Sequence, residues 1–79
     1  MKTVHVFDVV LPNNGWEGLY ESEVLDILKN HYESYEVRTN TLNNARRMTI
    51  GVLTIDSVYE SILQSIRTNL GIEIAEVPE

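Results

Sequence analysis

The sequence predicts an α+β domain of ferredoxin-like type, with a four-stranded antiparallel sheet and two helices on one face. The main observation is a pattern that occurs twice: a strand-like apolar run, an amphipathic helix-like run and a second strand-like run. The first unit is Val4 to Leu11, Ser22 to Tyr32 and Tyr35 to Thr39, and the second is Met48 to Ile55, Ser57 to Leu70 and Ile72 to Val77. Right-handed crossovers put both helices on the same face. This fold centres the first and third strands, which are also the most apolar of the four.

Length and composition restrict the class of protein. The chain of 79 residues forms a single domain, 1–79, with an ordinary apolar fraction of 43%. A core of this size leaves little net stability, which favours oligomerisation. The chain has no cysteine, which excludes disulfides and thiolate metal sites. We expect a soluble, cytoplasmic protein with no membrane association, because its first apolar run is interrupted by His5 and Asp8 and none approaches about 18 residues.

The first unit begins with a strand whose apolar residues point to both faces of the sheet. This strand ends at Pro12 and the turn that follows it. Apolar residues then recur at helical spacing, at Tyr20, Val24, Leu25, Leu28 and Tyr32. Ser22 is the predicted N-cap, although Trp16 and Gly18 leave open an earlier start.

The second unit begins after an edge strand of alternating pattern and an Asn-rich connection. Gly51 interrupts the next strand, which indicates a bulge or a close approach of another group. Ser57 and Glu60 are spaced as a capping box for the second helix, and Gly71 is placed to end it.

Apolar residues on both parities of the central strands predict that some of them face away from the helices. We assign to this open face the set His5, Phe7, Val9, Ile50 and Val52. The pattern alone also permits the opposite parity. An exposed apolar sheet face on a small domain indicates a contact surface, most simply for a second copy in a homodimer.

Charge gives the second indication of a partner. The net charge is −6, and the acidic residues gather before residue 37. General nucleic-acid binding is not expected, because such a protein repels phosphate at long range. A basic or nucleic-acid-binding protein is the favoured partner, with the domain acting as an inhibitor of the phage-encoded type. The phosphate surrogates would be Glu17, Glu21, Glu23, Asp26, Glu33 and Glu36. The alternative is a solvated face that keeps the domain soluble.

Two single residues need a separate interpretation. Trp16, in a glycine-flanked turn, is either an exposed binding residue or a lid over the end of the core. Asp8, in the middle of a strand, needs a partner, and Arg47 on a neighbouring strand is a candidate. His5 lies on the opposite pleat face from Asp8, so the two cannot hold a metal together.

The sequence contains no motif that indicates catalysis. It has no phosphate-binding glycine loop, no nucleophile motif and no metal-binding histidine pair. We therefore expect a protein that is not an enzyme and that has neither a cofactor nor a metal.

The turn at Asn14-Gly15, between the first strand and first helix, resembles that of ACT domains, which share this order of elements. The resemblance implies a regulatory domain with a small-molecule site near Asn13 to Trp16, although the proline-glycine-leucine run of that family is absent. The element order is also similar to that of RNA-recognition motifs. Of the stacking aromatics that those need on the central strands, only Phe7 is present, which argues against RNA binding.

Overall fold

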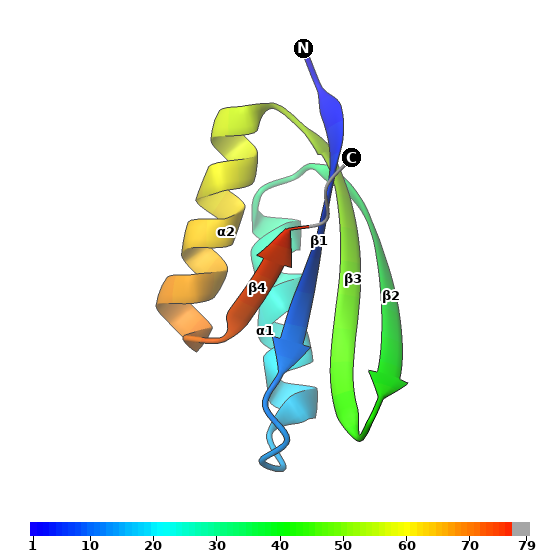
Figure 1. Ribbon diagram of the computed structural model, residues 1–79. Helices are drawn as coiled ribbons and strands as arrows, with labels where there is room; N and C mark the ends of the chain where they lie inside the picture. Colours follow the sequence, from blue (N-terminus) through cyan, green and yellow to red (C-terminus); the bar gives the residue numbers. More distant parts are fainter. Residues whose placement is uncertain (77–79) are drawn as a thin grey trace.

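Strands and helices alternate in the order βαββαβ, as the sequence predicts. The computed structural model describes residues 1–76. Its elements are β1 (Thr3–Leu11), α1 (Glu17–Asn30), β2 (Ser34–Leu42), β3 (Ala45–Thr54), α2 (Asp56–Leu70) and β4 (Glu73–Glu76). The sheet is antiparallel with the order β2-β3-β1-β4, so that β1 and β3 are central. Both helices lie on one face of the sheet (Figure 1). The ferredoxin-like arrangement predicted from the sequence is therefore confirmed.

The hydrophobic core lies between the sheet and the two helices. Phe7 and Ile50 of the central strands are 0% exposed, as are Val24 of α1 and Ile62 of α2. Burial of such a side chain contributes about 1.5–3 kcal/mol. The alternation of strand side chains and the three-to-four spacing of the helices bring these residues into one layer.

The predicted composition of the open sheet face is wrong. The residues assigned to it, His5, Phe7, Val9, Ile50 and Val52, are on the helix side, where the last four are 0% exposed. The open face instead carries Val4, Val6, Asp8 and Val10 of β1. The side of β1 that carries Phe7 and Val9 is buried because the β3 residues paired with it are apolar. The other side of β3 carries Arg47, Thr49 and Gly51. Comparison of the two strands would have revealed this in the sequence.

Helix α1 begins at Glu17, earlier than the predicted Ser22 cap. The turn before it is held by the Asn14 side chain, whose Oδ1 accepts a hydrogen bond from the Trp16 backbone N–H at 3.0 Å. Glu17 Oε1 accepts one from the Gly15 N–H at 3.1 Å. At the other end the helix stops at Asn30, and Tyr32 leaves the predicted buried stripe with 91% exposure.

Helix α2 begins at Asp56, and the predicted Ser57 capping box is wrong because no side chain caps this end. The predicted C-cap is confirmed: Gly71 has φ 61°, and its N–H donates a hydrogen bond to Arg67 O at 2.9 Å. This left-handed conformation favours glycine. In the last predicted strand, Val77 lies outside the described residues.

The β2–β3 connection is a two-residue turn, Asn43 and Asn44, with φ of 53° and 64°. Positive φ at both positions is typical of a type I′ hairpin turn, and asparagine tolerates it. The tight turn extends β2 beyond the predicted end at Thr39. The register of β3 is uninterrupted across Gly51, so the predicted bulge is absent.

Candidate interaction site on the open sheet face

The open face of the sheet is apolar at the end where β1 begins. Val4, Leu53 and Ser34 form one row across β1, β3 and β2, and Val6, Gly51 and Glu36 form the next. Val4 is 53% exposed and Leu53 is 41% exposed, although both lie on central strands.

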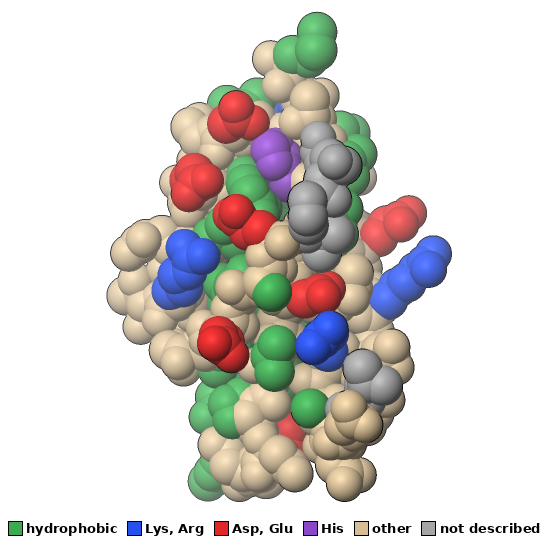
Figure 2. All heavy atoms as spheres, in the orientation of Figure 1, with side chains coloured by type: hydrophobic (Ala, Val, Ile, Leu, Met, Phe, Trp, Pro, Cys, Tyr) green, Lys and Arg blue, Asp and Glu red, His purple; other side chains and the backbone are tan. Residues whose placement is uncertain are grey.

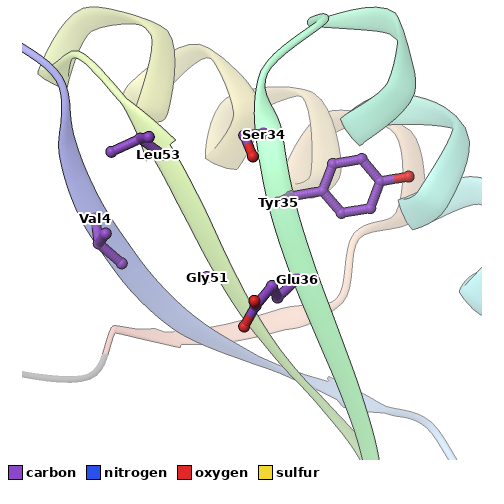
Figure 3. Close-up of a pocket in the computed structure, with 6 residues that line it drawn as sticks. All are labelled: Val4, Ser34, Tyr35, Glu36, Gly51 and Leu53. Carbon is purple, nitrogen blue, oxygen red and sulfur yellow. The ribbon is translucent and has the colours of Figure 1, made fainter.

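A hollow of about 220 Å³ lies over Gly51 on this face. Its lining residues are Val4, Ser34, Tyr35, Glu36, Gly51 and Leu53. Figure 3 shows Val4 and Leu53 on neighbouring strands beside Gly51, with the Tyr35 ring directed away from the others. A dry cavity of about 150 Å³ can hold benzene, so the hollow offers room for one large apolar side chain.

Residue 51 contributes no side chain to the hollow. A Cβ placed on Gly51 would meet only Val4 Cγ1, at 4.0 Å, which is ordinary van der Waals contact. The local backbone does not require glycine either, since Gly51 has no positive φ. Neither strain nor close packing therefore explains a glycine in this central strand.

The adjoining part of the open face is polar and internally paired. Thr49 Oγ1 donates a hydrogen bond of 2.7 Å to Asp8 Oδ1, and Arg47 Nη1 lies 3.6 Å from Asp8 Oδ2. The predicted pairing of Asp8 with Arg47 is confirmed. These contacts satisfy the carboxylate that the sequence places in the middle of a central strand.

The predicted acidic surface does not form a single array. Glu21 Oε1 lies 2.8 Å from Arg46 Nε, and Glu33 Oε2 lies 3.3 Å from Lys2 Nζ. Glu36 is on the open face, whereas Glu23 and Asp26 are exposed on α1. Four of the six carboxylates proposed as phosphate surrogates thus lie on α1, whereas Glu33 follows this helix and Glu36 is on β2.

Two of these carboxyl groups have a lowered pKa. The Thr54 hydroxyl, followed by Lys2, holds the pKa of Glu33 below 4.5. Backbone N–H groups of Glu17 itself and of Gly15 lower the pKa of Glu17. Neighbouring groups of the domain itself therefore stabilise the ionised form of both carboxyl groups.

His5 takes part in the packing of β1 against α2. Its ring stacks on Tyr59 with centroids 4.3 Å apart and an interplanar angle of 17°, and its Nε2 lies 3.4 Å from Asp56 Oδ1. No group of three potential metal ligands occurs within residues 1–76. In the same part of the chain, no helix is long and apolar enough to cross a membrane.

A second hollow, of about 210 Å³, lies at the β1–α1 turn and the β2–β3 hairpin. It is lined by Asn13, Glu17, Thr41, Asn44 and Arg46. The sequence indicates only the first part of this site, because the hairpin residues approach it through the sheet register. Trp16, which directly precedes Glu17 in the chain, is 60% exposed, so the interpretation as a lid over the core is wrong.

The visible surface has no extensive apolar area. Figure 2 shows acidic and basic side chains interspersed on the β4 side of the molecule, with hydrophobic side chains in small separate areas.

Comparison with known proteins supports the fold and assigns no family. No family model matches the chain, and no curated protein matches. The designed protein Foldit4 is similar, with a TM-score of 0.75 and 10% identity over 100% of this chain and 99% of that chain. An uncharacterized protein from Thermotoga maritima, TM1266, has a TM-score of 0.74 and 14% identity, over 99% of this chain and 98% of its own. The designed protein Ferredog-Diesel has a TM-score of 0.62 and 9% identity, over 99% and 87% of the two chains.

Proposed function

We propose that this protein is a non-enzymatic interaction domain whose open sheet face receives one large apolar side chain of a protein partner. The observation that carries the proposal is the hollow over Gly51, beside the exposed Val4 and Leu53. Interaction hot spots commonly consist of one large anchor side chain in a pocket. The exposed apolar side chains would lose contact with water on binding, at about 25 cal/mol per Å².

The partner is expected to be basic near its anchor residue. The domain has a net charge of −6, so its long-range field favours the approach of positive charge. Direct binding of nucleic acid is disfavoured by the same field. Because Arg47 pairs with Asp8 on the open face, this arginine is already engaged within the domain.

The proposal can be tested by NMR titration with short capped peptides. We expect Lys-Phe-Lys to shift the amide signals of Val4, Gly51 and Leu53. Two control peptides should shift them less: Lys-Ala-Lys, which lacks the anchor side chain, and Glu-Phe-Glu, which lacks the favourable charge. The substitution Gly51→Val fills the hollow and should abolish the shifts. The proposal fails if the phenylalanine peptide moves none of these signals, or if Gly51→Val responds as the wild type does.

A second candidate is a regulatory domain that binds a small molecule, as ACT domains do. It is favoured by the polar hollow beside the β1–α1 turn, where Arg46 and Glu17 place opposite charges around one space. A free amino acid would suit this charge pair, although its carboxylate would have to share Arg46 with Glu21, which lies 2.8 Å from Arg46 Nε. Millimolar amino acids, tested one at a time, should then raise the melting temperature and alter Trp16 fluorescence. The candidate fails if none of them does either.

A further inference from the structure

The outer edge of β2 is a long, uncovered margin of the sheet. The strand has nine residues, Ser34–Leu42, and pairs only with β3 among the described elements. Figure 1 shows no helix or loop beyond it. Proteins commonly protect such edges with proline, lysine, a bulge or a covering segment. β2 contains neither residue and keeps an unbroken register with β3.

The register determines which backbone groups of β2 point outward. Leu42 and Ala45 flank the two-residue turn and form the closing hydrogen-bonded pair of the hairpin. Hydrogen-bonded pairs then recur at every second residue, so Glu36 and Arg38 direct their backbone groups toward β3. The backbone N–H and C=O groups of Tyr35, Val37 and Thr39 point to the open edge.

We propose that two copies of this chain pair antiparallel through β2, with the Val37 residues of the two copies opposite each other. In this register the outward backbone N–H and C=O groups of Val37 form hydrogen bonds with those of Val37 in the second copy. The groups of Tyr35 form hydrogen bonds with those of Thr39 in the second copy. The two sheets become one continuous sheet. The proposal does not require a ligand in the hollow over Gly51, although Tyr35 and Glu36 of β2 also line that hollow.

Charge selects this register over its neighbours. The outward groups match only when the register changes in steps of two residues. With Val37 opposite Val37, Glu36 of each copy faces Arg38 of the other in a non-hydrogen-bonded pair, where side chains are closest. A step in one direction places Glu36 opposite Glu36, and a step in the other places Arg38 opposite Arg38. Like charges directly opposite each other are destabilising.

The helix side of β2 also fits a second copy. Tyr35 and Val37 point toward the helices, but both remain partly exposed, whereas their β3 neighbours Val52 and Ile50 are 0% exposed. The helices therefore leave the margin of the core incompletely covered. A second β2 strand would bring Val37 and Thr39 of the other copy alongside these side chains.

Charge reversal provides the decisive test, read out by analytical ultracentrifugation over a range of concentrations. The wild type should reach twice the 9.1 kDa monomer mass. Glu36→Arg or Arg38→Glu alone creates like-charge pairs and should weaken the dimer by about tenfold or more. An equimolar mixture of the two variants should restore pairing, because the arginine introduced in one variant then faces the glutamate introduced in the other.

Matched controls separate this effect from general charge and from folding. Glu23→Arg and Arg67→Glu change the same charges on helices and should leave the dimer intact, as should Gly51→Val. The N–H of Thr39 points outward and makes no hydrogen bond to β3, so Thr39→Pro should weaken the dimer and leave the β2–β3 pairing intact. Circular dichroism checks that this variant is folded. A wild-type monomer at millimolar concentration, single reversals that still dimerise, or a mixture that stays monomeric would each overturn the proposal.

Discussion

Thr49 donates a hydrogen bond of 2.7 Å to Asp8 across the two central strands, and Arg47 approaches the other carboxylate oxygen of Asp8 to 3.6 Å. The three residues link β1 to β3 on the face that the helices do not cover. The carboxylate of an acidic residue in a central strand is thereby paired within the domain.

Substitution of Thr49 tests this link. Thr49→Val keeps the β-branched shape and removes the hydroxyl donor, so we expect a loss of about 1–2 kcal/mol in the free energy of unfolding. Urea denaturation measures it. In an Asp8→Asn background the same substitution should cost less, and equal costs in both backgrounds would show that the two residues are not coupled.

Two glycines should respond in opposite ways to valine. Gly51→Val adds a strand-favouring side chain where there is room, so the free energy of unfolding should stay within about 1 kcal/mol of the wild type or rise. Gly71→Val forces a β-branched residue to φ 61° and should cost about 1–2 kcal/mol or more. Thermal denaturation of both variants checks the contrast, which is contradicted if Gly51→Val is the more damaging.

The ion pair between Glu21 and Arg46 connects α1 to the hairpin. Their side chains are 19% and 46% exposed, so we expect Glu21→Gln to cost at most about 1 kcal/mol. The cost should fall in high salt, because screening weakens the wild-type pair. Glu23→Gln is a matched control on the exposed side of the same helix and should change little. A loss independent of salt would contradict an electrostatic origin.

Alkaline pH should destabilise the fold through Tyr59. Burial, followed by the nearby Glu76 and Glu60 carboxylates, raises the pKa of Tyr59 from 10.0 to about 12. The unfolded chain therefore releases this proton first, and stability falls as the pH rises above 10 and through the folded pKa. Tyr59→Phe should lose less stability than the wild type between neutral pH and about pH 11, as measured by urea denaturation. An equal loss in both proteins would exclude Tyr59 as the cause.

The order of elements could be predicted from the sequence because periodicity and turn residues act locally. The start of α1 at Glu17 could not be predicted in this way. The Asn14 and Glu17 side chains fix the preceding turn by accepting hydrogen bonds from backbone N–H groups, which no helical pattern reveals. Strand β2 is also longer than the alternating segment that predicts it, Tyr35 to Thr39. Two asparagines in left-handed conformations form the turn and allow β2 to extend to it.

The composition of the open face could not be predicted from β1 for a different reason. Both parities of β1 are apolar, so this strand alone gives no preference between its two faces. The preference arises in the pairing with β3, where one parity contains Met48 and Ile50 and the other contains Arg47 and Thr49. The hollow over Gly51 likewise depends on three strands side by side. Such a site becomes visible only once the register is known.

The two margins of the sheet differ in length: β2 has nine residues, whereas β4, as described, has four. Antiparallel pairing about a twofold axis consumes the longer margin in both molecules at once. Each outer side of the pair then carries β4, which has four residues in the part of the chain that the structure describes, and a short strand is a poor template for adding further chains. Assembly through β2 would therefore end with a closed pair and would not propagate into a fibre.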